Sequence, residues 1–325
     1  MSIVSNVVIV DGRPEVRAAV GTDFPNASQR WTLADALEDV DAVVIATPPE
    51  SHFELAAEAI AAGKHVLVEK PMATSTAEAT EMVQLAREAG VTLAAGHTFA
   101  HNAAVWKLKD IVDSGELGRL HYLDAARLNL GLYRNDVNVL WDLAAHDISI
   151  TTALLCDVPD SVSAWGGRHT KRFDEDVAML RMLFERKQIE STVRVSWLDP
   201  VKVRRTTIVG SEKMAVYDDM NEDERIKIFD HGRKQNGGLL GDPPTVRYRF
   251  GDVTAPRIDF SEPLRLELSD FIDCARTGRR PRADGHAGLT VVAVLEASDQ
   301  SLRENGAPVP IHLPHLHEAL AQAVA

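Results

Sequence analysis

The sequence predicts an α/β protein of two domains, with a parallel sheet in residues 1–118 and a mostly antiparallel open sheet in residues 119–325. Short apolar runs alternate with segments of helical length as far as Asp113, which is typical of parallel βαβ units. Later segments are rich in Val, Ile, Tyr and Arg, and many alternate with period two, which indicates a sheet with one wet face. A chain of 325 residues can build a core in each of two domains.

The N-terminal domain is expected to alternate strands and helices. Short apolar runs predict the strands Asn6–Val10, Ala42–Ala46, His65–Glu69 and Thr92–Gly96. A further short strand is expected near Ser28–Trp31. Amphipathic segments predict its helices, which are Pro14–Val20, Leu33–Leu37, Ser51–Ala62, Ser75–Ala89 and His101–Asp113. Gly63 suits a C-terminal cap because glycine adopts the left-handed conformation without strain. The segment Ser114–Gly118 marks the expected domain boundary.

The second domain is expected to be a sheet interrupted by helices. Alternating segments predict its strands, which are Leu120–Leu130, Val162–His169, Asp176–Phe184, Glu190–Trp197, Arg204–Val209 and Lys213–Tyr217. Helical spacing predicts Trp141–Leu155, Pro263–Thr277 and Ala287–Glu304. The glycines and prolines of Lys234–Pro244 predict a loop.

Composition excludes several classes of function. The formal net charge of −13 leaves no basic footprint, so no nucleic-acid partner is expected. No apolar run is long enough to span a bilayer, and the first ten residues lack the basic start of a signal peptide. Cys156 and Cys274 show no metal-ligand spacing, so we expect no metal and interpret both as reduced core residues of a cytoplasmic protein.

Two places in the sequence indicate chemistry. The run Val66–Glu69 leads to Lys70, which the pattern places at the carboxyl edge of a parallel sheet, where open α/β sheets bind ligands. Asp142 and His146 are four residues apart, so on an α-helix they share one face. A lysine and a histidine that converge on a crevice suit acid–base chemistry at an alcohol carbon. Taken singly, a lysine after a strand is usually a solvated surface charge, and an Asp/His pair at this spacing is a common surface pair.

In these motifs the sequence resembles the Gfo/Idh/MocA family of NAD(P)-dependent oxidoreductases. The matching segments follow the family order over nearly the whole chain and include Ala46–His52, Ala62–Pro71, Gly96–Phe99, Trp141–Asp147 and Glu262–Leu264. The resemblance implies a Rossmann-type dinucleotide-binding domain, followed by an α+β domain for substrate binding and oligomerisation. It implies hydride transfer between NAD, with NADP as the alternative, and a ring hydroxyl carbon of a sugar. It also implies a homodimer or homotetramer.

The resemblance assigns roles to individual residues. Lys70 and His146 handle the proton of the reacting sugar hydroxyl, and either of them serves as the base. Asp142 orients the imidazole of His146 or touches the sugar. The residues implied to bind the cofactor are Asp11, Thr47, Pro48, His52, Glu69, Lys70 and His97. His52 equally fits a surface histidine at a helix start. The loop with Arg134 and Asn138 resembles the subgroup that acts on nucleotide-linked sugars, and these two residues are the expected substrate contacts.

The family's G-x-G-x-x-G turn is absent from this sequence. Val7–Asp11 instead resembles the second strand and its ribose-binding acid, so Asp11 favours NAD, although Arg13 beside it softens that preference. We therefore expect the sequence to start after the first strand and helix of a βαβ unit, about 30 residues into it. The other interpretation is an inactive relative that binds sugar or serves as a structural subunit. In both cases the strand at Asn6–Val10 should lack its central neighbour.

Overall fold

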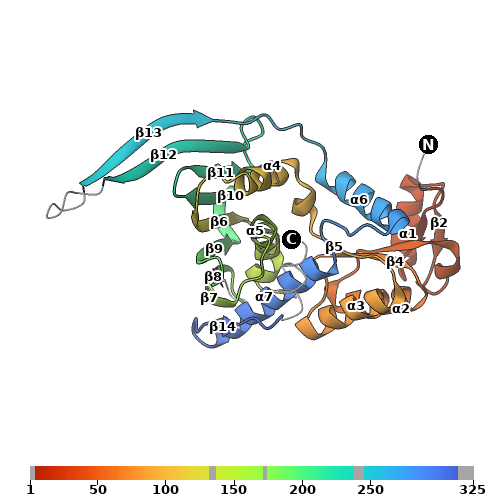
Figure 1. Cartoon of the computed structure of the whole chain (residues 1–325). Helices are drawn as coiled ribbons and strands as arrows, with labels where there is room; N and C mark the ends of the chain where they lie inside the picture. Colours follow the sequence, from red (N-terminus) through yellow and green to blue (C-terminus); the bar gives the residue numbers. More distant parts are fainter. Residues whose placement is uncertain (1–3, 132–136, 171–173, 237–244, 314–325) are drawn as a thin grey trace. The chain divides into compact units, whose positions relative to one another are not determined.

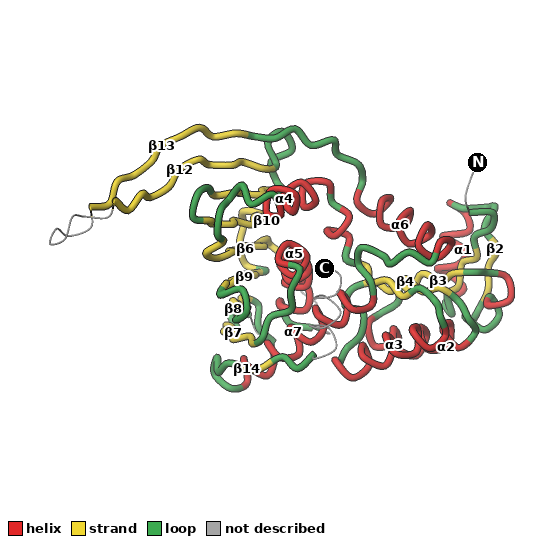
Figure 2. The backbone as a smooth tube through the Cα atoms, viewed as in Figure 1, coloured by secondary structure: helices red, strands yellow, loops and turns green. Residues whose placement is uncertain are grey.

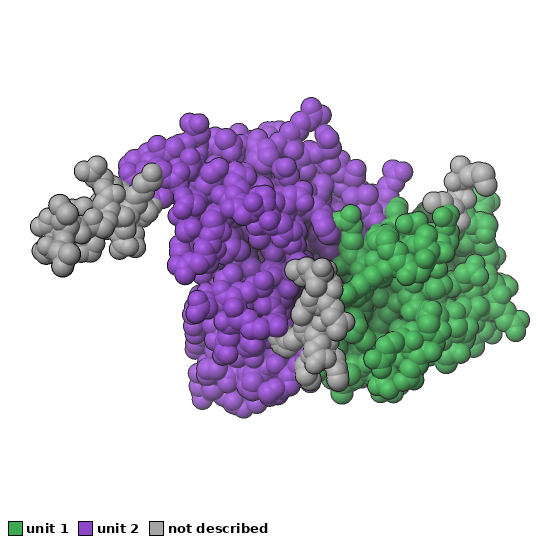
Figure 3. Space-filling view, in the orientation of Figure 1, with its two compact units in different colours: residues 1–96, 267–292 green, residues 97–266, 293–325 purple. Residues whose placement is uncertain are grey.

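The computed structural model describes residues 4–131, 137–170, 174–236 and 245–313. The chain forms two compact units, coloured separately in Figure 3. Unit 1 comprises residues 1–96 and 267–292, and unit 2 comprises residues 97–266 and 293–325. The division differs from the expected boundary at residue 118, and segment 267–292 returns to unit 1. One reason is that Ala95 N donates a hydrogen bond of 2.9 Å to Ala283 O, beside a β-bridge between Ala94 and Asp284.

Unit 1 alternates strands and helices as expected (Figure 1). Its strands are β1 (Val8–Val10), β2 (Ser28–Arg30), β3 (Ala42–Ile45), β4 (His65–Glu69) and β5 (Leu93–Gly96). Its helices are α1 (Pro14–Asp23), the 3₁₀ turns η1 (Leu37–Asp39) and η2 (Pro49–Ser51), α2 (His52–Ala61) and α3 (Thr76–Ala89). The predicted helix Leu33–Leu37 is wrong: this segment is a run of bends and turns that leads into η1, and it is too short to nucleate a helix.

Each strand of unit 1 is parallel to its neighbour, but the strands form two separate sheets. β1 pairs with β2, and β3, β4 and β5 pair in that order. In the parts of the chain that the structure describes, no strand is hydrogen-bonded to the second edge of β1 or of β3. Among the described strands, β2 is therefore the hydrogen-bonded neighbour of β1, in a sheet separate from β3–β5.

The core of unit 1 lies on both faces of β3, β4 and β5. On one face, Phe271 of α6 (Pro263–Thr277) packs on Leu67 and Ala94. On the other face lie α2 and α3, as Figure 2 shows. Because side chains alternate along a strand, the completely buried Val66 and Val68 point to the face opposite Leu67.

Unit 2 is built on a nine-stranded sheet in the order β13-β12-β11-β10-β6-β9-β8-β7-β14. Its strands are β6 (Leu120–Leu130), β7 (Ser161–Gly167), β8 (Val177–Phe184), β9 (Ile189–Ser196), β10 (Leu198–Gly210), β11 (Met214–Asp218), β12 (Ile226–Asn236), β13 (Thr245–Thr254) and β14 (Val309–Pro310). All neighbours are antiparallel except β6 and β9. The predicted mostly antiparallel open sheet is confirmed.

The helices of unit 2 include η3 (Thr98–His101), α4 (Ala103–Asp113), η4 (Leu140–Ala144) and α5 (Ala145–Leu155), and α7 (Gly285–Arg303) ends in this unit. Along β9, Val193 and Val195 are fully buried while Glu190 and Arg194 are exposed, so one face of the sheet is wet. The distal residues of β12 pair with β13 alone, and this hairpin projects beyond the other strands of unit 2 (Figure 1).

Two expectations about single features need correction. The predicted helix Trp141–Leu155 begins with a π-helical turn, η4, before the α-helix α5. Cys156 is not a core residue: it is exposed, with a φ of 45° at the C-terminal cap of α5, whereas Cys274 is buried. Both cysteines are free. Among the described residues, no helix combines the length and apolar character that crossing a bilayer requires.

Candidate active site

The turn after β4 carries Glu69, Lys70 and Pro71 at the carboxyl end of the strand. β4 ends at Glu69, as expected from the proline two residues later, and the Lys70–Pro71 peptide bond is cis. Oε2 of Glu69 accepts a hydrogen bond of 3.2 Å from the backbone N of Lys70. A Cβ on Gly96 of the neighbouring strand would lie 3.0 Å from Cα of Glu69. Glycine at this position therefore lets β5 approach the Glu69–Lys70 turn closely.

His52 joins two turns at the carboxyl edge of the parallel sheet. Its Nδ1 lies 2.8 Å from Pro71 O, and its Nε2 lies 2.8 Å from Thr47 O. The side chain is 1% exposed, so the surface interpretation of this histidine is wrong. Thr47 and Pro48 form the turn after β3, where Ser51 Oγ donates to Thr47 Oγ1 and to Pro48 O. The structure therefore brings Thr47, Pro48, His52 and the Lys70–Pro71 turn together.

Asp11 follows β1 directly, at the position expected for a ribose-binding acid. Its carboxylate accepts hydrogen bonds from the side chain and backbone N of Arg13. These bonds lower the pKa of Asp11 to about 2, so the group is ionised at neutral pH. The structure therefore gives Asp11 the negative charge that a ribose acid needs, with Arg13 as its ion-pair partner.

In unit 2, His146 lies against a buried ion pair through an aromatic ring. The rings of Phe99 and His146 have centroids 5.1 Å apart and are tilted by 59°. The guanidinium of Arg127 lies 4.6 Å from the centroid of the same Phe99 ring. Nε of Arg127 donates a hydrogen bond of 2.7 Å to Asp147, and both side chains are buried. Phe99 thus lies between the imidazole of His146 and the buried Arg127–Asp147 pair.

Asp142 and Asn138 lie around the π turn that begins the same helix. Oδ2 of Asp142 accepts a hydrogen bond of 3.0 Å from Nε1 of Trp197. The amide of Asn138 is used within the protein: its Oδ1 accepts from Leu140 N and Trp141 N, and its Nδ2 donates to Asp299. We infer that Asn138 caps this turn, which does not support its expected role of reading the substrate.

His97 and Arg134 are the two remaining predicted site residues. His97 stands before η3 and is 1% exposed, three residues from the buried Ala100. Arg134 lies outside the described residues. Sequence reasoning assigned no role to Phe99, Arg127, Asp147 or Trp197, although Phe99 and Asp147 fall inside the motifs that carried the family resemblance.

Burial raises the pKa of Asp299 above its usual range, and hydrogen bonds from Trp141 and Asn138 offset part of that rise. Asp299 therefore belongs to the support of the π turn.

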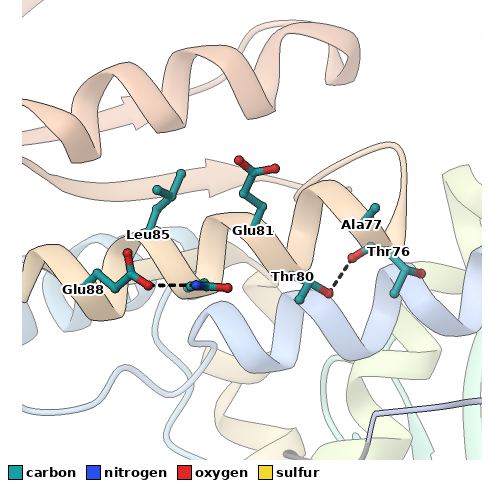
Figure 4. Close-up of a pocket in the computed structure, with 7 residues that line it drawn as sticks. Thr76, Ala77, Thr80, Glu81, Leu85 and Glu88 are labelled. Carbon is teal, nitrogen blue, oxygen red and sulfur yellow. Dashed lines mark hydrogen bonds between the residues drawn. The ribbon is translucent and has the colours of Figure 1, made fainter.

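The hollow in Figure 4 runs along α3 between Thr76 and Glu88 and contains none of the predicted site residues. The hydrogen bonds drawn there run from Thr80 Oγ1 to Thr76 O and from Gln84 Nε2 to Glu88 Oε1, and both lie within one helix. In the described ranges, no three His, Cys, Asp or Glu side chains are grouped to hold a metal ion.

The described residues of unit 1 fit part of a dinucleotide. Asp11 offers a charged carboxylate for ribose hydroxyls, and the turns after β3 and β4 present Thr47, Glu69 and Lys70 at one sheet edge. The chain does not contain a G-x-G-x-x-G turn for the pyrophosphate. The residues present therefore fit the ribose part of the cofactor.

Comparison with known proteins agrees with this geometry. The family described as "Oxidoreductase family, NAD-binding Rossmann fold" matches residues 7–97, and the "GFO/IDH/MocA C-terminal domain" matches residues 105–216. The UDP-N-acetylglucosamine 3-dehydrogenase of Acidithiobacillus ferrooxidans is 30% identical over 259 residues, which are 79% of this chain and 77% of the relative.

Solved structures of dehydrogenases also resemble this chain. A structure of the Acidithiobacillus ferrooxidans enzyme has a TM-score of 0.75 at 27% identity and covers 92% of this chain and 90% of its own. The structure of the WlbA dehydrogenase from Bordetella pertussis, in complex with NADH and UDP-GlcNAcA, has a TM-score of 0.74 at 25% identity. The match covers 94% of this chain and 90% of that dehydrogenase. From its two matching domains and its relatives, the chain belongs to the Gfo/Idh/MocA family of oxidoreductases, with an NAD-binding Rossmann domain in its N-terminal part.

Proposed function

We propose that this protein is a dehydrogenase that oxidises a ring hydroxyl of a nucleotide-linked sugar with NAD. The observation that carries the proposal is the setting of His146, whose imidazole packs on Phe99 beside the buried Arg127–Asp147 pair. A histidine held in a partly buried, fixed orientation suits proton transfer close to neutral pH. Relatives whose printed activities are nucleotide-sugar and inositol dehydrogenation support the reaction class.

The proposed chemistry divides between the cofactor and the side chains. NAD, when bound, would supply the acceptor for the hydride of the sugar carbon. His146 accepts the hydroxyl proton as the carbonyl forms, and Asp142 keeps the reacting groups oriented. Lys70 donates a hydrogen bond to the same oxygen and stabilises its developing negative charge. The reversed assignment, with Lys70 as base, differs from this one in its pH dependence.

The cofactor preference follows from Asp11. Its carboxylate is charged at neutral pH and would repel a 2′-phosphate, so we propose NAD as the cofactor. Arg13 is already paired with this carboxylate. A freed Arg13 would be the group that accommodates NADP.

The substrate assignment rests on relatives and on the sequence of one loop. The relatives named for UDP-sugars include the Acidithiobacillus ferrooxidans enzyme and the Bordetella pertussis dehydrogenase. Arg134 is the proposed contact to a phosphate or carboxylate of the substrate, because a guanidinium binds either group in a bidentate manner.

A panel of sugars tests the function. Purified protein is incubated with NAD and, separately, UDP-N-acetylglucosamine, its uronic acid derivative, myo-inositol and glucose, and NADH is followed at 340 nm, the wavelength of its absorbance band. We expect turnover with a UDP-linked sugar and at least a 100-fold lower kcat in His146→Ala. Turnover of the free sugars alone would reject the nucleotide-sugar assignment, and wild-type rates in His146→Ala would reject the role of the histidine.

We also propose that the wet face of the unit 2 sheet joins copies of this chain. Exposed Tyr122 and Met179 lie on strands of this sheet, at 47% and 49% exposure, and a second copy would shield them. The two free cysteines fit our proposal of a cytoplasmic location. Light scattering after size exclusion should give at least twice the chain mass of 35.6 kDa, and Met179→Glu should reduce it. A monomeric wild type would reject this interface.

A further inference from the structure

Trp197 connects the carboxylate of Asp142 to the sheet of unit 2. Its indole Nε1 donates a hydrogen bond of 3.0 Å to Oδ2 of Asp142. Trp197 directly follows β9, and its side chain is 2% exposed. The bond therefore forms away from bulk water, where a hydrogen bond to a carboxylate is stronger than at the surface.

The backbone around Trp197 fixes the indole in place. Trp197 N donates a hydrogen bond of 2.9 Å to Asp176 O, and Trp197 O accepts one of 3.0 Å from Gly131 N. A Cβ on Gly131 would lie 2.3 Å from Cδ1 of the indole and 2.8 Å from its Cγ. The ring thus packs directly on the backbone of Gly131, and any larger residue there would displace it.

Asp142 lies in the irregular first turn of its helix. It belongs to the π turn η4, and π turns are rare and occur frequently at functional sites. The preceding residue is anchored in the same manner, since Nε1 of Trp141 donates a hydrogen bond of 2.7 Å to Asp299. Two adjacent residues of the turn are therefore held by indole–carboxylate hydrogen bonds, one to α7 and one to the residue that follows β9.

We propose that Trp197 is a positioning residue that holds the carboxylate of Asp142 in its active orientation, and that Gly131 sets the place of the indole. The proposal rests on the function proposed above, in which Asp142 and His146 take part in proton transfer. Trp197 acts through Asp142.

A double-mutant cycle tests the proposal, with Trp197→Phe, Asp142→Ala and their combination assayed with NAD and UDP-N-acetylglucosamine. Trp197→Phe keeps most of the ring and removes the donor, so we expect kcat to fall about tenfold or more with an unchanged KM for NAD. The double variant should be no slower than Asp142→Ala, because the indole has nothing left to hold. Gly131→Ala, which keeps the donor but moves it, should also lower kcat. The control Trp165→Phe alters a half-exposed indole elsewhere in unit 2 and should keep wild-type kcat.

A crystal structure of Trp197→Phe provides a readout that does not depend on activity. We expect the Asp142 side chain to leave its wild-type rotamer while η4 stays folded. An unmoved carboxylate would overturn the positioning role whatever the activity. The positioning role would also be overturned if the losses in kcat of the two single variants added up in the double variant. Wild-type turnover in Asp142→Ala would instead reject the proposed role of Asp142, and the crystal structure would still decide whether Trp197 orients it.

Discussion

The ring of Phe99 lies against the guanidinium of Arg127, 4.6 Å from ring centroid to Cζ, and against the imidazole of His146. The guanidinium is held in turn by Asp147, the residue that follows His146 in the chain. The imidazole is thus connected to the ion pair in two ways, through the Phe99 ring and through the chain that joins His146 to Asp147. A change in the ion pair should therefore affect both the stability of unit 2 and the orientation of His146.

Removal of Arg127 should be strongly destabilising. The side chains of Arg127 and Asp147 are 5% and 2% exposed, so Arg127→Met leaves a buried carboxylate without its cation. We expect the free energy of unfolding, measured in urea, to fall by about 3–5 kcal/mol. The double variant Arg127→Met/Asp147→Leu should recover most of this loss. A single variant as stable as the wild type would show that the pair does not matter.

Lys70 and His146 should differ in the pH dependence of their variants. Lys70→Ala and His146→Ala are each expected to lower kcat by about 100-fold or more. If His146 is the base, the acid limb of the kcat/KM profile is lost in His146→Ala and kept in Lys70→Ala. The opposite pattern would assign the base to Lys70. Exposed Lys187 offers a control, and Lys187→Ala should match the wild type.

Gly96 should tolerate a methyl group poorly. In Gly96→Ala the new Cβ would lie 3.0 Å from Cα and Oε2 of Glu69 and 3.2 Å from Val68 O, so β4 or β5 must shift. We expect a loss of about 1–3 kcal/mol in the free energy of unfolding, and weaker NADH binding because Glu69 and Lys70 move. Gly12→Ala is the matched control, since its Cβ meets nothing within 4 Å. Equal melting temperatures for the two variants would contradict this prediction.

Asp176 should make stability depend on pH in the acid range. Burial alone would raise the pKa of Asp176, but hydrogen bonds from the His169 ring and from the backbone N of Thr170 and His169 lower it overall. Because the folded pKa is lower than the unfolded value of about 3.9, the charged form stabilises the fold above that value. This stabilisation is lost as the pH falls through the folded pKa.

Asp176→Asn should accordingly be less stable than the wild type at pH 7, and the difference should narrow below about pH 4. Urea unfolding at several pH values measures it. Asp259→Asn changes a carboxylate that is 90% exposed and should follow the wild type throughout. A gap between Asp176→Asn and the wild type that stays constant down to the lowest pH would contradict the linkage.

Elements with clear local signals could be predicted from the sequence. β6 and α6 have the predicted bounds, and α6 starts at Pro263 and is followed by Gly278 with a φ of 72°. The β12–β13 hairpin escaped prediction because its distal residues pair only with each other, and the end of β12 at Lys234–Asn236 falls where glycines and prolines predict the loop Lys234–Pro244. The π turn at Leu140–Ala144 also carries no local signature.

The candidate site likewise contains residues that the sequence predicts and supporting residues that it does not. Lys70, Asp142 and His146 stand in motifs whose positions in strands and helices can be read locally. Their supports are distant in the chain: Arg127 reaches Asp147 across 20 residues, and Trp197 reaches Asp142 across 55. Such partners depend on how β6, β9 and α5 pack, which a single sequence does not report.

The split between the two sheets of unit 1 has a consequence for local unfolding. No described ladder of backbone hydrogen bonds joins β1 and β2 to β3, so the pair can separate from β3–β5 without breaking sheet hydrogen bonds between them. Side chains such as Arg17, which lies over the Trp31 ring and donates to Asp11 O, hold this pair to α1. The segment from β1 to β2 should therefore open as its own cooperative unit. In hydrogen exchange, the backbone amide proton of Ile9 should exchange with solvent faster than that of Leu67.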